Sequence, residues 1–254
     1  MEAQGIGMND QQDEALLRLE KVSKYFGNVG ALEEVDFDLR SGEIMGLVGD
    51  NGAGKSTLIK IICGIYRPTK GQIYLEEKPI QIESPHVARR LGITAVYQDL
   101  ALAEDLTIAE NVLLTREPTR WGFLQRTKMR EMAQLAMRRL DIEVDSVQSR
   151  VRDLSGGQRQ AVAIARALHT TPKIAVMDEP TAALAVKEVG LALKIIQSLK
   201  EQGIAVIFIS HVLEEILEVC DRITVLLRGR KVCCSNRGDL DKQKLMSRMM
   251  GDIT

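Results

Sequence analysis

The sequence has no apolar run long enough to cross a bilayer, which takes about 18 to 20 residues in a helix. Its longest apolar stretches, such as residues 58–66, are short or interrupted by charge. Residues 1–15 also lack the basic segment followed by an apolar one that marks a secretory signal, and we expect residues 1–14 to form a flexible polar tail. Any role at a membrane is therefore expected from the cytosolic surface and through partner proteins.

Cysteine and excess charge are also scarce. The four cysteines are too few and too unevenly spaced for a disulfide framework. The adjacent pair Cys233 and Cys234 has no histidine or second cysteine pair at ligand spacing, so reduced thiols are favoured over a metal site. The 34 basic and 35 acidic residues give a net charge of -1, which argues against a nucleic-acid partner but leaves a local basic patch open.

The chain alternates strand and helix patterns within an ordinary globular composition. Its 254 residues suffice for one large domain or two small ones. We predict helices at residues 55–65, 187–202 and 213–220, and strands at residues 16–22, 31–39, 43–48, 71–75, 79–82, 93–97, 173–177, 205–210, 222–227 and 231–234. The runs IAVM and AVIFI are apolar throughout, which is typical of central parallel strands covered on both faces.

Residues 100–167 have a helical character instead. One amphipathic face there is formed by Met129, Met132, Ala133, Ala136 and Leu140. Thr127 is the expected N-cap of this helix, and we interpret the methionines as core residues. The sequence thus predicts an α/β core with a helical insertion at about residues 100–167, within one domain that spans residues 15–254.

A phosphate-binding loop is predicted at residues 49–56, which fit the pattern G-x-x-x-x-G-K-[ST] between a strand and a helix. The glycines let successive N–H groups point at one anion, and the helix N-terminus adds its positive end. In this motif Lys55 reaches the β- and γ-phosphates, and the Ser56 hydroxyl binds Mg²⁺. An accidental turn is disfavoured, since such turns rarely join a strand to a helix. We predict that ATP and Mg²⁺ bind through Gly49, Asp50, Asn51, Gly52, Ala53, Gly54, Lys55, Ser56 and Thr57.

An acidic pair follows the apolar strand at residues 173–177, at the edge where ligands bind in α/β sheets. Asp178 is expected to hold Mg²⁺ through water, and Glu179 to polarise the attacking water. The alternative is a solvated acidic turn that opens a helix. It is disfavoured because it leaves the phosphate loop without an acidic partner.

A second anion site is indicated at residues 154–158, Leu-Ser-Gly-Gly-Gln. These small residues precede the alanine-rich stretch QAVAIARAL, so the segment predicts another helix N-terminus open to a phosphate group. Two phosphate-docking points in one chain disfavour a small-molecule kinase, which needs one such point and an acceptor pocket.

With these motifs in this order, the chain from about residue 17 onward resembles the ATP-binding subunit of an ATP-binding cassette (ABC) transporter. The resemblance implies a P-loop NTPase (RecA-like) core, an antiparallel β subdomain, and a helical insertion that carries the 154–158 signature. It also implies that Ser155, Gly156, Gly157 and Gln158 contact the ATP that is held by a second subunit.

The resemblance extends to single residues elsewhere. Phe26 matches the aromatic residue that stacks on adenine, with Tyr25 as the second choice. Gln98 matches the glutamine that touches Mg²⁺ and senses the transmembrane partner, and His211 matches the switch histidine at the γ-phosphate. The implied catalytic set is Glu179, His211, Lys55 and Gln98, and the implied metal set is Ser56, Gln98 and Asp178. His86 and His169 match no motif and are expected at the surface.

One position departs from the family pattern S-A-L-D, because Ala185 stands where the aspartate is usual. This puts in doubt the polar contact that the aspartate normally makes across the dimer. The variant E-P-T-A-A-L is nevertheless similar to the ATPases of ribose-, xylose- and fructose-type importers. The stretch at residues 116–126, with Trp121-Gly122-Phe123, and the segment Y-Q-D-L-A-L point the same way.

The function implied by the resemblance is ATP hydrolysis that drives import of a monosaccharide. Two copies, most simply identical, would face each other head to tail with ATP between residues 49–56 of one and residues 155–157 of the other. Other implied partners are transmembrane permease subunits, contacted near residues 98–104, and indirectly a periplasmic or extracellular solute-binding protein. The chain would sit peripherally on the cytoplasmic face of the inner membrane.

Three other functions stay open. The cargo could be an amino acid, a peptide or a lipid. A cassette ATPase could act on DNA or ribosomes, although such proteins tend to carry coiled-coil inserts or paired cassettes. A non-catalytic regulator is disfavoured because Lys55, Asp178, Glu179 and His211 are all in place.

Overall fold

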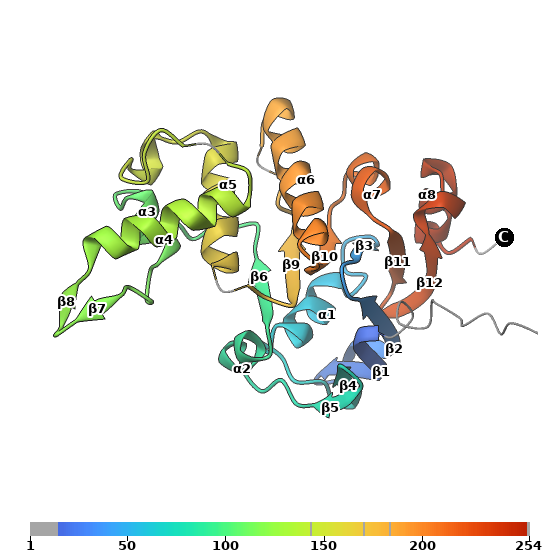
Figure 1. The fold of residues 1–254 in the computed structure, drawn as a ribbon. Coiled ribbons are helices and arrows are strands. Elements are labelled where there is room, and N and C mark those ends of the chain that lie inside the picture. The colour runs from blue at the N-terminus through green and yellow to red at the C-terminus, as the bar shows by residue number, and fades with distance from the viewer. Residues whose placement is uncertain (1–14, 143, 170, 183, 253–254) are drawn as a thin grey trace, which may run out of the picture.

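A six-stranded sheet forms the centre of the computed structural model, which describes residues 15–142, 144–169, 171–182 and 184–252. The predicted tail at residues 1–14 lies outside the described residues. The strand order is β12-β11-β3-β10-β9-β6, and every pairing is parallel except that of β11 with β12 (Figure 1). These strands are β3 (Ile44–Val48), β6 (Ile93–Val96), β9 (Ile174–Asp178), β10 (Ala205–Ile209), β11 (Arg222–Leu227) and β12 (Arg230–Asn236).

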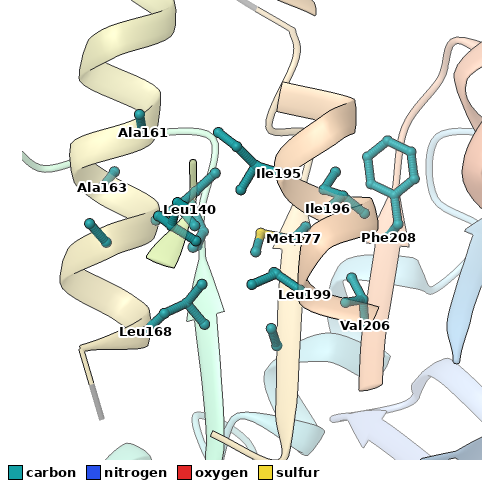
Figure 2. Close-up of a cluster of buried hydrophobic side chains, with 14 of the residues drawn as sticks. Leu140, Ala161, Ala163, Leu168, Met177, Ile195, Ile196, Leu199, Val206 and Phe208 are labelled. Carbon is teal, nitrogen blue, oxygen red and sulfur yellow. The ribbon is translucent and has the colours of Figure 1, made fainter. Parts of the chain in front are cut away.

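The central strands are apolar on both faces because a separate core covers each face. In β10, Val206 and Phe208 belong to the core under the helices, whereas Ile207 and Ile209 belong to the core under the second sheet. Figure 2 shows the first of these cores, in which β9 and β10 pack against α5 (Gly156–Leu168) and α6 (Val186–Glu201). The predicted stripe of α6 is buried there, as Ala192, Ile195, Ile196 and Leu199.

The second sheet is antiparallel, in the order β2-β1-β4-β5. Its strands are β1 (Ala15–Phe26), β2 (Val29–Arg40), β4 (Lys70–Leu75) and β5 (Lys78–Ile80). The first two strands run longer than predicted, and β5 lies earlier than the predicted residues 79–82. Helix α1 (Lys55–Ile62) is buried in the core that this sheet shares with the central one.

Helices between β6 and β9 form a group to one side of the sheet (Figure 1). They are α3 (Ile108–Val112), α4 (Arg126–Arg139) and α5, with a hairpin of β7 (Thr119–Arg120) and β8 (Phe123–Leu124) and a 3₁₀ turn at Val151–Asp153. Two predictions for α4 were wrong. Its N-cap is Gln125 and not Thr127, because the hairpin already delivers the chain into the helix. Met132 is exposed, since it lies about 100° around the helix from the buried Ala133.

Two further helices were not predicted, α2 (Pro85–Arg90) and α8 (Lys242–Met250), whereas α7 (Leu213–Val219) was. A second 3₁₀ turn, Arg237–Asp239, precedes α8. Among the described residues, no helix combines the length and the apolar character that a membrane span requires.

Candidate functional site

The phosphate-binding loop joins β3 to α1 at the carboxyl edge of the central sheet. Gly49, Gly52 and Gly54 have φ angles of 149°, 82° and 104°, which side-chain-bearing residues rarely adopt. A Cβ on Gly49 would lie 2.2 Å from the carbonyl oxygen of Leu226, and one on Gly54 would lie 2.9 Å from that of Ala31. A Cβ on Gly52 would meet no heavy atom within 4 Å. Conformation and space together therefore require glycine at two of the three positions.

Lys55 is held at this loop by backbone oxygens. Its Nζ donates to the carbonyl oxygens of Gly49 at 2.5 Å and Asp50 at 3.1 Å. Burial lowers the pKa of Lys55, while the nearby carboxylates of Glu179, Asp50 and Asp178 act in the opposite direction. One ammonium and two strand-end carboxylates therefore share this edge of the sheet. Ser56 and Thr57 follow in the first turn of α1, and Ser56 is exposed.

The acidic pair lies beside the end of β10, because Asp178 is the register partner of Ile209. Burial raises the pKa of Asp178, the charge of Glu179 raises it further, and Lys55 lowers it. Glu179 has a φ of 52°, and its backbone N–H donates to the carbonyl oxygen of Ile209 at 3.0 Å. From this position Glu179 Oε2 lies 3.0 Å from Nε2 of His211. The structure thus brings the predicted base and the predicted switch histidine together.

A buried carboxylate that the sequence analysis did not single out, Glu215 of α7, ties together the segments that carry this pair. Its Oε2 accepts hydrogen bonds from the hydroxyls of Thr181 and Ser210, both at 2.7 Å. Thr181 follows Glu179 by two residues, and Ser210 directly precedes His211. All three bonded side chains are buried. Glu215 could have been predicted from the sequence, because it is an acidic residue on the apolar, buried face of α7.

An open pocket of about 450 Å³ lies over the loop. It is lined by Gly49, Asp50, Asn51, Lys55, Ser210, His211, Leu213, Met246, Met249 and Met250. The methionines come from α8, so one wall of this polar pocket is apolar. None of residues 155–158, all of which the structure describes, lines the pocket.

Phe26, the predicted adenine-stacking residue, ends β1. Its ring lies edge to face on Tyr66 with a centroid distance of 5.1 Å, and the Lys24 ammonium is 5.2 Å from the ring centre. The side chain is 44% exposed, so a ring surface is available to a planar ligand. Tyr25 is less exposed, and its ring approaches Gly30.

Gln98 is exposed two residues beyond β6. The preceding Tyr97 hydrogen-bonds to the thiol of Cys63, which directly follows α1. Burial raises the pKa of that thiol to about 12. Beyond Gln98, Arg166 of α5 fixes the chain by donating to the carbonyl oxygens of Leu100 and, at 2.7 Å, of Ala101.

A groove of about 370 Å³ runs beside this segment and reaches the helical group. Tyr97, Asp99, Leu100, Arg116 and His169 are among its lining residues. His169 was expected at the surface, but it is half-buried, with its ring nitrogens 3.0 and 3.1 Å from the Arg116 guanidinium.

The signature segment begins α5 with a reciprocal cap. Ser155 Oγ accepts from the backbone N–H of Gln158 at 3.3 Å, and Gln158 Oε1 accepts from the backbone N–H of Ser155 at 3.0 Å. The side chain of Gln158 therefore serves the helix end itself.

Glu188 of α6 occupies the start of α5. Its carboxylate bonds to the backbone N–H of Gly157, to that of Ala185 at 3.1 Å and to the Ser155 hydroxyl, and these bonds hold its pKa below the usual range. A Cβ on Gly156 would lie 2.9 Å from Glu188 Oε2. The protein's own carboxylate therefore lies where the sequence predicts a bound phosphate.

Comparison with known proteins agrees with this geometry. Residues 32–182 match the family described as ABC transporter. The ribose import ATP-binding protein RbsA 1 of Rubrobacter xylanophilus is 46% identical over 93% of this chain and 47% of its own length. The xylose/arabinose import ATP-binding protein XylG of Sulfolobus acidocaldarius is 47% identical over 85% of this chain and 86% of its own length.

A solved structure is similar over most of this chain. It is a dimeric, post-hydrolysis ATP-binding cassette bound to ADP and Pi, with a TM-score of 0.73 and 28% identity over 87% of this chain and 98% of that one. The chain spans about half the length of the ribose protein but most of the xylose/arabinose protein. The matched residues include both the phosphate loop and the signature helix, and this chain belongs to the ABC transporter family.

Proposed function

We propose that this chain binds and hydrolyses ATP to drive import of a monosaccharide through partner permease subunits. The observation that carries the proposal is the Glu179–His211 contact of 3.0 Å at the edge of the phosphate loop. A regulator that only bound nucleotide would need neither a base nor a histidine beside it. The ATPase domain is residues 15–254, with a helical subdomain at about residues 100–167.

In this proposal the loop binds the phosphates of ATP and the strand ends hold the reacting water. Lys55, now bonded to carbonyl oxygens of its own loop, turns to the β- and γ-phosphates. Glu179 accepts the proton of the attacking water, and His211 orients that carboxylate and the γ-phosphate. Phe26 stacks on adenine.

The residues at this edge also fit Mg²⁺. The pKa of Asp178 is raised by burial and by the charge of Glu179, so a cation here would relieve repulsion between two carboxylates. Asp178, Ser56 and Gln98 supply oxygen atoms, the ligands that Mg²⁺ prefers. When bound, the ion would neutralise charge on the triphosphate.

A second copy completes the site. Residues 155–158 are not among the described residues that line the pocket of their own loop, which leaves this segment to contact ATP on another chain. For that contact, the Gly157 N–H exchanges the Glu188 carboxylate for a phosphate oxygen. The dimeric state of the similar cassette supports this arrangement. ATP then favours the closed pair, and its hydrolysis releases the pair, because the γ-phosphate is what the two states bind differently.

The partner and cargo assignments are supported by a groove and by the names of two relatives. The groove beside residues 97–101 suits a cytoplasmic loop of a permease, which would place the chain peripherally on the cytoplasmic face of the membrane. A monosaccharide cargo is supported by relatives named for ribose and for xylose/arabinose import. A solute-binding protein outside the cell would deliver that sugar to the permease.

The test is Glu179→Gln in the purified protein. This variant should keep ATP affinity, lose about 10² to 10⁴-fold in hydrolysis, and elute as an ATP-dependent dimer. Lys55→Ala should lose ATP affinity, and Glu214→Gln, at an exposed ion pair with Lys242, should match the parent. Hydrolysis by Glu179→Gln at the parent rate would remove the assigned base, and full turnover by a strictly monomeric preparation would remove the shared site. Uptake assays with a panel of sugars test the cargo.

A further inference from the structure

The β7–β8 hairpin exposes three large apolar side chains. Trp121 is 88%, Phe123 79% and Leu124 50% exposed. Trp121 and Gly122 form the turn with φ angles of 54° and 83°, a two-residue connection that presents the tryptophan at its tip. Figure 1 shows the hairpin projecting from the helical group, away from the central sheet. Exposed apolar side chains gathered in one place mark an interaction surface.

The same part of the chain is strongly basic. Residues 116–139, which we term the basic arm, contain seven Arg and Lys residues and two Glu residues, in a chain whose net charge is -1. The seven cations are Arg116, Arg120, Arg126, Lys128, Arg130, Arg138 and Arg139, and all are exposed. None of the ion pairs found among the described residues involves any of them.

Five of the seven cations lie along α4, and the seven do not converge on one pocket. On the outer side of α4 they alternate with the exposed apolar residues Met132 and Leu135. An exposed helix face that mixes cations and apolar groups, next to an aromatic tip, is typical of proteins that lie on an anionic membrane surface. A compact anion such as free phosphate would use two or three of these cations and none of the apolar groups.

The arm also begins at the groove assigned to the permease. Arg116 lines that groove, and β7 starts three residues later, at most about 11 Å along the chain. A chain docked on a permease through the groove therefore carries the arm near the bilayer. This orientation rests on the proposed function, whereas the exposed aromatic and basic side chains do not.

We propose that the basic arm binds anionic lipid headgroups directly. Trp121, Phe123 and Leu124 enter the headgroup region, where tryptophan is favoured, and the cations lie against lipid phosphates. Either contribution alone gives weak, reversible binding, and together they hold a peripheral protein at the surface.

The test uses Trp121 as its probe, because it is the only tryptophan of the chain. Its emission should shift to the blue and resist iodide quenching with vesicles of phosphatidylcholine and phosphatidylglycerol, but not with phosphatidylcholine alone. High salt should reverse the shift. The protein should sediment with the anionic vesicles under the same conditions.

Variants that keep the tryptophan separate the two contributions. The double change Arg120→Gln and Arg126→Gln should weaken vesicle binding about twenty-five-fold, at about fivefold for each cation near the surface. Phe123→Ser should weaken binding while keeping its salt dependence. Arg67→Gln removes an exposed arginine outside the arm and should bind as the parent does. All should keep the parent far-UV circular dichroism.

Three outcomes would overturn the proposal. An unchanged emission with both vesicle types would exclude lipid as the partner, and equal shifts with both types would exclude a role for the cations. A shift seen only with detergent-solubilised permease would make the arm a protein contact. The assay contains no nucleotide, so Lys55→Ala should bind vesicles as the parent does. If the ATPase proposal were wrong, the parent protein would fail to hydrolyse ATP, and the vesicle assay would be unaffected.

Discussion

Replacing Arg222 with methionine should lower the free energy of unfolding by about 3 to 5 kcal/mol at pH 8. The Arg222 guanidinium lies 2.7 Å from Asp38 and 3.2 Å from Glu43, and the side chains of Arg222 and Glu43 are only 14% and 6% exposed. Methionine fills much of the same space but carries no charge. Glu43 keeps the backbone N–H of Arg40 as a donor at 2.7 Å but loses its counter-charge, and an uncompensated buried charge is the costly part.

The deficit should shrink at lower pH. Burial already raises the pKa of Glu43 with Arg222 present, and removing Arg222 raises it further, so Glu43 takes up a proton and the buried charge disappears. A carboxyl whose pKa is raised by folding destabilises the fold above that pKa and is relieved below it. Asp38 acts in the same direction. Although burial raises its pKa, the hydrogen bond and charge of Arg222 and the charges of Lys231 and Arg40 together lower it. The stability that this pair gives the parent is therefore lost as the pH falls through the folded-state pKa.

Urea unfolding followed by circular dichroism at pH 8 and pH 5 measures the deficit and its relief through Glu43, because the lowered pKa of Asp38 keeps that carboxylate ionised at both pH values. Arg152→Met is the matched control, because Arg152 lies 3.0 Å from Asp105 in a pair whose side chains are 51% and 82% exposed. Its loss should stay below about 1 kcal/mol. If the two variants lose the same stability within about 0.5 kcal/mol, or if the Arg222→Met deficit grows at pH 5, the reasoning from burial is wrong.

Four further predictions follow from single residues. Gly49→Ala should lower the melting temperature and abolish ATP binding, because the new Cβ would lie 2.2 Å from a backbone oxygen. Gly52→Ala should lower the free energy of unfolding by only about 1 to 2 kcal/mol, which is the strain of its positive φ. Equal melting temperatures of the two variants would contradict this reasoning. Glu215→Ala should lower the free energy of unfolding by about 2 kcal/mol or more in urea, since two buried hydroxyls lose their acceptor, and should lower kcat; an unchanged kcat would leave Glu215 a stabilising role alone. Glu188→Gln should form the ATP-bound dimer at lower ATP concentration in gel filtration, because an amide carries no charge against the γ-phosphate, and an unchanged midpoint would count against that. Cys63, with a pKa of about 12, should resist iodoacetamide at pH 8 in the native protein and react in urea, as measured by mass spectrometry.

The parts of the fold that could be predicted were those that short patterns of neighbouring residues in the sequence determine. The apolar runs of β9 and β10 predicted central strands, and the structure confirms them because each face of these strands meets a different core. The order of glycines and Lys55 predicted the turn between β3 and α1. Helix α8 was missed because it buries little apolar surface, with Leu245 its one fully buried residue among those described.

The parts that could not be predicted depend on contacts between distant segments. Glu215 acquires its place only when α7 meets residues on two neighbouring strand ends, and Glu188 only when α6 packs beside the start of α5. Neither contact produces a periodic pattern in the sequence. Met132 fell outside the buried stripe for a related reason, since the width of a stripe depends on what packs against it.

Glu188 connects two helices that belong to different parts of the molecule. Ala185 gives α6 no side-chain cap. The Glu188 carboxylate instead accepts hydrogen bonds from the N–H of Ala185, at the start of α6, and from the N–H of Gly157, at the start of α5, and so links the two helices. In the proposed dimer, the nucleotide of the other chain accepts the hydrogen bond of the Gly157 N–H, so Glu188 loses this bond to α5 and keeps its bond to Ala185. The start of α5 then has one hydrogen bond fewer to α6, while the apolar core that the two helices share stays packed. A ligand held by one chain thus weakens a polar contact between two helices of the other.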